Sequence, residues 1–222
     1  MAEYVVEFGN VGAPPEPDGR LDAPAFHRNH APIWALISPF LDGRSGHVLE
    51  VGSGTGQHVV AFARQAPDLV WWPRDINDKH LRSIEAWRAH AGLVNLRPPL
   101  RIDLAAWACG ATELAVPDAL TAIVCINVLH IAPWRVAEGL MTGAARHLGP
   151  HGRLFVYGPF MRDGFHTAPS NAAFDASLLR ENPAWGVRDT TDVAALAARF
   201  GLRLAEIAEM PANNLMLVFD RV

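Results

Sequence analysis

Residues 48–58 read VLEVGSGTGQH, in which a short apolar segment leads into a glycine-rich turn and then a helix. Gly52, Gly54 and Gly56 allow positive φ angles and a close approach of the backbone to a ligand. The first turn of the following helix offers unpaired N–H groups that favour an anionic group. We therefore expect this turn to bind a small ligand, together with its neighbours Ser53 and His58.

Acidic residues lie near this turn and at the ends of the next two predicted strands. Asp75 ends the second strand, where a carboxylate can accept hydrogen bonds from both ribose hydroxyls. Asp103 ends the third strand and can accept a hydrogen bond from an adenine amino group. Glu50 lies inside the first strand, where burial requires hydrogen bonds from the turn or from the ligand. Either strand-end acid alone fits an ordinary polar strand end equally well, but with the turn they predict a nucleoside site. The apolar residues that follow them, Ile76 and Leu104, are included in that site.

Three other kinds of site are excluded by spacing. The dinucleotide pattern G-x-G-x-x-G needs glycine or alanine at position 57, where Gln57 is found. The triphosphate-binding loop needs Gly-Lys-Ser/Thr, which the sequence lacks. The histidines show no H-E-x-x-H or other compact ligand spacing, so no metal site is expected.

This pattern of residues resembles that of the class I methyltransferases that use S-adenosylmethionine. It consists of the glycine turn, the acid before it and the acids after the next two strands. This resemblance implies S-adenosylmethionine as the cofactor and S-adenosylhomocysteine as its product. It also implies that Asn127, at the end of the fourth strand, lies beside the methionine part of the cofactor or the transferred methyl group.

Methyl transfer from a sulfonium is an in-line displacement, so the protein must mainly align the reactants. A base is needed only where the acceptor arrives protonated. His130, which follows the fourth strand, is the first candidate for this base, and Tyr157 and His166 are the others. A histidine bonded to backbone beneath the following turn explains His130 equally well.

Further candidates lie at the start of the first helix and in the second half of the chain. Arg28 and Asn29 are expected to hold the carboxylate of the cofactor, because arginine pairs well with carboxylates. The candidates for contact with the acceptor are Trp134, Asn171, Asp175, Arg188 and Asn213.

The elements that must position these residues alternate along the chain. Apolar spacing predicts helices over 24–41, 57–66, 77–91, 133–148 and 191–200, and strands over 47–51, 69–75, 96–104, 119–127 and 152–160. A hairpin over 202–222 follows, turning at 211–214. This order predicts an α/β fold: a Rossmann-like seven-stranded sheet with parallel strands, a C-terminal antiparallel hairpin and helices on both faces.

The predicted organisation is a loose, flexible arm over 1–23 and a single domain over 24–222. Residues 159–190 form a long irregular stretch, and stretches of this kind are often functional. We expect this insertion to lie on the acceptor side of the site.

The composition limits the partners. The chain has 222 residues, 50% of them hydrophobic, and a formal net charge of −4, which suits one folded domain. Its basic residues are scattered, so no nucleic-acid surface is expected. No apolar run approaches the ~20 residues that cross a bilayer, and the first residues lack the apolar region of a signal peptide. We expect a cytoplasmic protein with a small-molecule acceptor and no membrane contact. The oligomeric state, a homodimer included, is left open.

Nearly everything after residue 26 is similar to the DUF938, or methyltransferase-like 26, family. The matching segments include RNHAPI (28–33), LEVGSGTGQH (49–58), INVLHIAPW (126–134), APSNAAFDASL (168–178) and MPANN (210–214). Arg74 departs from the serine usual in the family, a change expected to alter contacts beside the ribose. Membership implies methyl transfer but fixes no substrate.

Two alternatives to a methyltransferase are kept. An NAD-dependent oxidoreductase is disfavoured by Gln57 and by the terminal hairpin. A methyltransferase-like subunit without catalytic activity is disfavoured by the intact glycine turn.

Overall fold

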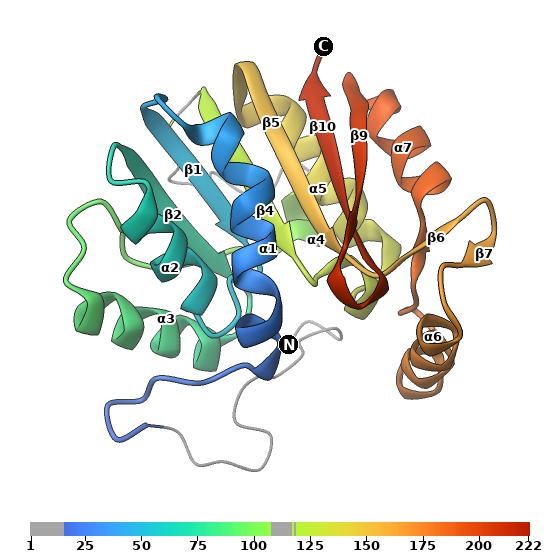
Figure 1. Ribbon diagram of the computed structural model, residues 1–222, viewed down its shortest axis with the longest axis horizontal. Helices are drawn as coiled ribbons and strands as arrows, with labels where there is room; N and C mark the ends of the chain where they lie inside the picture. Colours follow the sequence, from blue (N-terminus) through green and yellow to red (C-terminus); the bar gives the residue numbers. More distant parts are fainter. Residues whose placement is uncertain (1–15, 108–116, 118) are drawn as a thin grey trace.

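A seven-stranded sheet forms the centre of the computed structural model, which describes residues 16–107, 117 and 119–222. The strand order is β3-β2-β1-β4-β5-β10-β9. Strands β1 to β5 run parallel, and β10 lies antiparallel between β5 and β9 (Figure 1). This arrangement confirms the predicted α/β fold with its antiparallel C-terminal hairpin. The strands are β1 (Gly46–Val51), β2 (Leu69–Asp75), β3 (Leu100–Arg101), β4 (Leu120–Ile126), β5 (Leu148–Gly158), β9 (Leu202–Met210) and β10 (Asn214–Arg221).

Helices cover both faces of the sheet, as predicted. Val48 and Val124 pack in the core that contains α1, α2 and α3, whereas Leu49 and Ile123 pack in the core of α4, α5 and α7. Successive strand residues point to opposite faces, so a continuous apolar run feeds both cores. The helices are α1 (Pro24–Leu41), α2 (Gln57–Gln65), α3 (Asp78–Ala91), α4 (Leu104–Trp107), α5 (Trp134–His147) and α7 (Thr190–Arg199). None of the helices in the described ranges is long and apolar enough to cross a bilayer.

The predicted third strand is much shorter in the structure. Residues 96–104 were expected to form it, but only Leu100 and Arg101 form a strand paired with β2, and Leu96 makes an isolated bridge with Trp71. Pro98 and Pro99 have no N–H group to donate to a neighbouring strand, which explains the short pairing.

Residues 159–190 are ordered into regular elements rather than the irregular stretch expected. They contain β6 (Phe160–Arg162), β7 (Phe165–His166), α6 (Pro169–Glu181) and β8 (Arg188–Asp189), and the three strands form a second sheet in the order β7-β6-β8. Of the α6 residues, only Asn171 and Leu178 are buried. Such a helix has no continuous apolar stripe, so its periodicity cannot be seen in the sequence.

The N-terminal segment, which we define as residues 16–23, is attached to the domain. Ser83 Oγ on α3 accepts a hydrogen bond from the Leu21 N–H at 2.9 Å, and Trp87 Nε1 donates to the Leu21 carbonyl at 2.9 Å. The Arg20 guanidinium lies 4.7 Å over the Trp87 ring. This part of the predicted loose arm is therefore held on α3, and the rest of the arm, residues 1–15, lies outside the described residues.

Candidate functional site

The three glycines of the turn at the carboxyl end of β1 have different roles, although all have positive φ angles. A Cβ atom at Gly52 would lie 2.4 Å from the Val128 side chain, and one at Gly56 would lie 2.8 Å from Ile84 Cα. Those two glycines are needed for packing. No atom of the described residues comes within 4 Å of a Cβ placed on Gly54. Gly54 is therefore the glycine whose backbone leaves room for a ligand.

Asp75, at the end of β2, holds this turn in place. Its Oδ2 accepts a hydrogen bond from the Gly54 N–H at 2.8 Å, and its Oδ1 accepts one from the Asn77 N–H at 2.8 Å. His80 Nδ1 lies 3.2 Å from Oδ1. A carboxylate has about four acceptor positions, so about one remains for a ribose hydroxyl. Both hydroxyls could bind Asp75 only if one of these partners moved. The next residue, Ile76, is partly buried against the core.

Glu50 is almost completely buried in β1, with 1% of its surface exposed. Its Oε2 has no hydrogen-bond partner among the described residues. Burial raises the pKa of this carboxyl to about 8, and the nearby Asp75 charge adds to the effect. Ser53 joins the turn to both strands, since its N–H donates to the Arg74 carbonyl at 2.9 Å and its hydroxyl donates to the Glu50 carbonyl at 3.2 Å. The acid expected from the sequence thus keeps an unused oxygen beside the turn.

The other side chains predicted to contact the nucleoside, those of Asp103 and Leu104, are engaged within the protein itself. Asp103 Oδ1 accepts a hydrogen bond from the Ala105 N–H at 2.9 Å, which caps the start of α4, and Leu104 is buried in the core. Their contact with an adenine ring stays a prediction. Arg74 points to the face opposite Asp75 and donates to the Pro73 carbonyl at 2.8 Å. Burial lowers the pKa of Arg74 to about 10.

The start of α1 reaches the same end of the sheet. Asn29 Oδ1 lies 2.7 Å from Nε2 of His58, which is the second residue of α2. The side chains of Asn29 and Asn214 both hydrogen-bond Tyr157 on β5, and the charge of Arg28 acts on the same phenol. Burial raises the pKa of Tyr157 and lowers that of His58 to about 3. These contacts favour a role for Tyr157 in positioning α1. They also bring the exposed Arg28 to the strand ends, and its pairing with the cofactor carboxylate stays a prediction.

Gln57 has a function that the sequence did not reveal. Its Nε2 donates to Asp22 Oδ1 at 2.7 Å, and its Oε1 accepts hydrogen bonds from the Ala23 N–H at 2.7 Å and from Thr55 Oγ1 at 2.9 Å. It therefore attaches the N-terminal segment to the glycine turn. The sequence offered no signal for this, because partners 34 residues apart follow no local pattern.

Three residues converge at the carboxyl ends of β4 and β5. Asn127 adopts φ of 58°, a conformation that asparagine tolerates better than most residues. His130 lies in the 3₁₀ helix η1 (Leu129–Ile131) and is 6% exposed. A Cβ atom at Gly158 would lie 3.4 Å from His130 Nδ1 and 3.8 Å from Asn127 Oδ1. Burial, together with the charge of Arg188, lowers the pKa of His130 to about 3, so the imidazole is neutral at pH 7.

The insertion packs over η1. Phe174, which the sequence analysis did not single out, places its ring edge-on to His130 with the centroids 5.5 Å apart. On the same helix, Asp175 Oδ1 accepts a hydrogen bond from the Val187 N–H at 2.7 Å, and its Oδ2 lies 3.4 Å from His166 Nε2. Spacing of one helical turn from the candidate Asn171 was the only available signal for Phe174.

Arg188 and Asn171 fasten the insertion to the rest of the domain. The Arg188 guanidinium donates to the carbonyls of Leu129, Ala132 and Ala184 at 3.2, 2.7 and 2.8 Å. Asn171 Nδ2 donates at 2.9 Å to the carbonyl of Asn213, in the turn between β9 and β10. Both contacts favour positioning roles over direct acceptor contact.

Trp134 begins α5, and the Arg188 guanidinium lies 5.8 Å over its ring. It lines a groove of about 500 Å³ that extends towards α7, with Arg188 on the same wall. Within residues 16–107, 117 and 119–222 no group of three or more His, Cys, Asp or Glu side chains is suited to holding a metal ion.

Several solved structures of similar fold are described as methyltransferases. CalO1, a methyltransferase in calicheamicin biosynthesis solved with SAH bound, has a TM-score of 0.66 at 19% identity; the match covers 86% of this chain and 54% of that one. The mitomycin 7-O-methyltransferase MmcR has a TM-score of 0.66 at 20% identity, over 80% and 49% of the chains. An O-methyltransferase family protein from Burkholderia thailandensis has a TM-score of 0.64 at 17% identity, over 86% and 57%. This chain spans about half the length of these proteins and has the class I methyltransferase fold.

A protein-family model gives a more specific result. The model, described as a protein of unknown function (DUF938), matches residues 20–221. The matched range contains the glycine turn, the acids at the strand ends, the insertion and the terminal hairpin. The chain therefore belongs to the DUF938 family.

Proposed function

We propose that this chain is an S-adenosylmethionine-dependent methyltransferase that acts on a small-molecule acceptor. The observation that carries the proposal is the buried Glu50 carboxyl beside the open backbone of Gly54. S-adenosylmethionine carries two cationic groups, a sulfonium and an ammonium. A buried carboxyl with an unused oxygen is costly unless a donor or a cation fills that place, so the chemistry of Glu50 fits this cofactor.

Other residues at the strand ends suit the remaining parts of the cofactor. Asp75 keeps about one acceptor position for a ribose hydroxyl, beside the room left at Gly54. Arg28 is exposed near Tyr157 and can pair with a carboxylate. In this proposal Glu50 binds the cationic end of the cofactor and Asp75 binds the ribose.

When bound, the cofactor supplies an electrophilic methyl group. The protein has to hold the acceptor in line with that group, and alignment of this kind accounts for much of the rate of a displacement. Asn127 and His130, which converge at the ends of β4 and β5, are the side chains proposed to orient the acceptor. His130 is neutral at pH 7, so one of its ring nitrogens can accept a hydrogen bond.

Position 57 argues against a dinucleotide cofactor. Gln57 stands where the dinucleotide pattern needs glycine or alanine, and its amide is bound to the N-terminal segment. The fold relatives support the methyltransferase proposal, since CalO1 is described with SAH bound and MmcR as a 7-O-methyltransferase. Mitomycin, which the description of MmcR names, is a small molecule, and we propose this acceptor class for the present chain.

Calorimetric titration of the full chain with S-adenosylmethionine and with S-adenosylhomocysteine tests the proposal, with NAD as the control. We expect saturable binding of the first two ligands in the micromolar range and none of NAD. Mass spectrometry of the denatured protein reports any co-purified ligand, which would otherwise mask binding. The proposal fails if ligand-free protein binds neither sulfur compound at millimolar concentration.

A further inference from the structure

We infer that the methyl acceptor is an aromatic hydroxyl compound, with its ring against Phe174 and its hydroxyl between Asn127 and His130. This inference rests on the proposed function and adds the class of substrate to it. It is argued from the hydrogen-bonding groups at the ends of β4 and β5, from the aromatic surface above them and from the nearby charge.

Two hydrogen-bond acceptors at this place have no partner. Within the described ranges no hydrogen bond reaches the ring nitrogens of His130 or the side-chain amide of Asn127, although His130 is only 6% exposed. A neutral imidazole has one acceptor nitrogen, and the Asn127 carbonyl oxygen is a second acceptor. Asn127 is only partly buried, and neither side chain is among the buried polar atoms that lack a partner, so both acceptors are open to a ligand that brings an O–H or N–H group.

Gly158 keeps the space between these two acceptors open. It is not among the residues with positive φ, so its backbone conformation does not require glycine. A methyl group there would instead contact His130 Nδ1 at 3.4 Å and approach Asn127 Oδ1 to 3.8 Å. The absence of a side chain at position 158 therefore leaves room for a ligand atom beside both groups.

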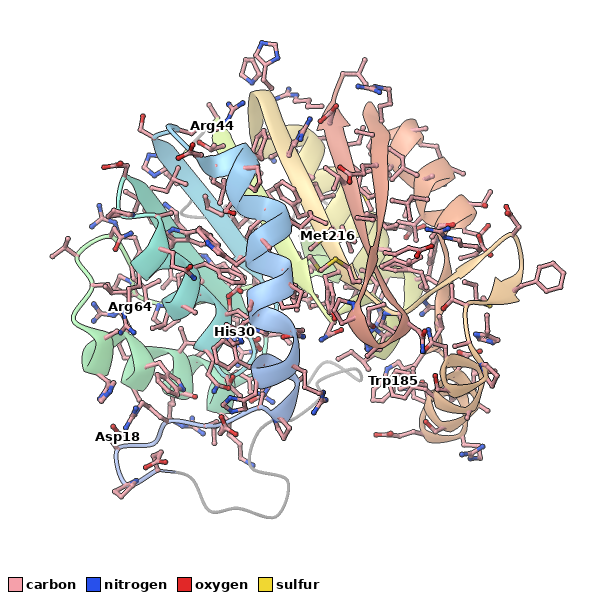
Figure 2. All side chains as sticks on the ribbon, viewed as in Figure 1. Asp18, His30, Arg44, Arg64, Trp185 and Met216 are labelled. Carbon is pink, nitrogen blue, oxygen red and sulfur yellow. The ribbon has the colours of Figure 1, made fainter. Side chains whose placement is uncertain are left out.

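The surface next to His130 is aromatic. The Phe174 ring makes an edge contact with His130 at an interplanar angle of 63°, yet it is 40% exposed. Leu178, Trp185 and Val187 form an apolar cluster next to η1, and Figure 2 shows Trp185 between α6 and the ends of the strands. An aromatic ring placed against Phe174 gains offset or edge contacts that an aliphatic ring of the same size does not.

The positive charge of Arg188 near His130 favours a hydroxyl over an amine as the accepting group of the substrate. The charge of Arg188 acts on His130 and lowers its pKa, and the carboxylate whose charge acts on Arg188 is that of Asp175. A positive charge at this place disfavours an ammonium group and favours an oxygen that becomes more negative as it loses its proton. A phenolic hydroxyl has this property.

Methyl transfer to the phenol is a displacement at the methyl carbon. A lone pair of the phenolic oxygen forms the new O–C bond while the C–S bond breaks and its electron pair returns to sulfur, so the sulfonium becomes a thioether. The hydroxyl proton passes to the unprotonated ring nitrogen of His130 and then to solvent. Because the pKa of His130 is about 3, the proton moves only as the oxygen becomes more acidic during bond formation.

Saturation-transfer NMR on the full chain with S-adenosylhomocysteine present tests the inference with three probes. We expect 4-nitrophenol to give the strongest signal, nitrobenzene a weaker one and cyclohexanol none. Phe174→Leu should reduce the 4-nitrophenol signal about two- to tenfold. Phe165→Leu is the matched control, since Phe165 lies in the same insertion but is 77% exposed. His130→Gln should remove the difference between 4-nitrophenol and nitrobenzene.

The inference is overturned if cyclohexanol binds as well as 4-nitrophenol, or if Phe174→Leu behaves like Phe165→Leu. It is also overturned if His130→Gln, folded by circular dichroism, still distinguishes the two aromatic probes. Calorimetry with S-adenosylhomocysteine on the same samples separates this failure from that of the proposed function. Cofactor binding without aromatic preference rejects only the acceptor class, whereas absence of cofactor binding rejects the proposed function itself.

Discussion

Gln57 at the start of α2 binds Asp22 in the N-terminal segment, with Nε2 and Oδ1 2.7 Å apart. The same amide accepts hydrogen bonds from the Ala23 N–H and from the hydroxyl of Thr55 in the glycine turn. One side chain thus connects the segment before α1 to the turn that we propose binds the cofactor. The order of the turn and the order of the N-terminal segment are therefore coupled.

Gln57→Leu should release the N-terminal segment. The substitution removes three hydrogen bonds, partly replaced by water, so we expect the free energy of unfolding to fall by about 2 kcal/mol. Urea denaturation measures this loss, and hydrogen exchange should show faster exchange of the Leu21 and Ala23 amides. Gln65→Leu on the same helix is the control, because Gln65 makes one exposed hydrogen bond to the Ala61 carbonyl. Equal effects of the two variants would contradict the role of Gln57.

Asp75→Asn should weaken binding of S-adenosylhomocysteine tenfold or more. The amide keeps one acceptor oxygen but turns an NH₂ group towards either the Gly54 or the Asn77 N–H, where two donors then face each other. Calorimetry measures the affinity. Asp68→Asn, an exposed residue just before β2, should leave it unchanged. Unaltered affinity of Asp75→Asn would rule out both its support of the turn and its contact with the ribose.

Glu50→Gln should flatten the dependence of stability on pH. The folded carboxyl has a pKa of about 8, far above the ordinary value that it regains on unfolding. Between these pKa values the folded state keeps a proton that the unfolded state has lost, so this residue makes stability fall as pH rises. Melting temperatures of both proteins at pH 5 and pH 8 give the test. The wild type should lose more stability than the variant over that range, and parallel changes would show that Glu50 is not a buried neutral acid.

Arg188→Lys should loosen the insertion without affecting the cofactor. Lysine cannot reproduce the fork that binds three backbone carbonyls, so we expect a loss of about 2 kcal/mol in urea denaturation. Affinity for S-adenosylhomocysteine should stay within about twofold. Arg180→Lys, at an exposed site on α6, is the control. A large loss of cofactor affinity in Arg188→Lys alone would mean that the insertion also supports the cofactor side.

The fold could be predicted because β1, β2 and β4 are short apolar runs, each followed along the chain by a helix with an apolar face. The 159–190 segment was harder, since α6 buries Asn171 and Leu178 alone and its contacts come from polar side chains. The third strand was overestimated because Pro98 and Pro99 interrupt its pairing with β2, which leaves an isolated bridge at Leu96 and a strand of two residues.

The candidate site, like the fold, could be predicted from the sequence only in part. The glycine turn and the acids at the strand ends could be recognised from their spacing. The sequence could not reveal which glycine leaves room for a ligand, because that depends on Val128 and Ile84, which approach from other elements. Nor could it reveal Phe174, whose importance arises from a contact with His130, 44 residues away along the chain.

The position of β10 between β5 and β9 has a consequence for synthesis on the ribosome. Strand β9 is synthesised before β10, but it joins the sheet only through β10, which lies between β9 and β5. The nascent chain must therefore hold β9 and the outer edge of β5 without a partner until residues 214–221 have left the exit tunnel. The contacts of Asn213 with α6 and of Asn214 with Tyr157 form in the same step. Ligand binding is thus expected to begin only after this last strand has been inserted.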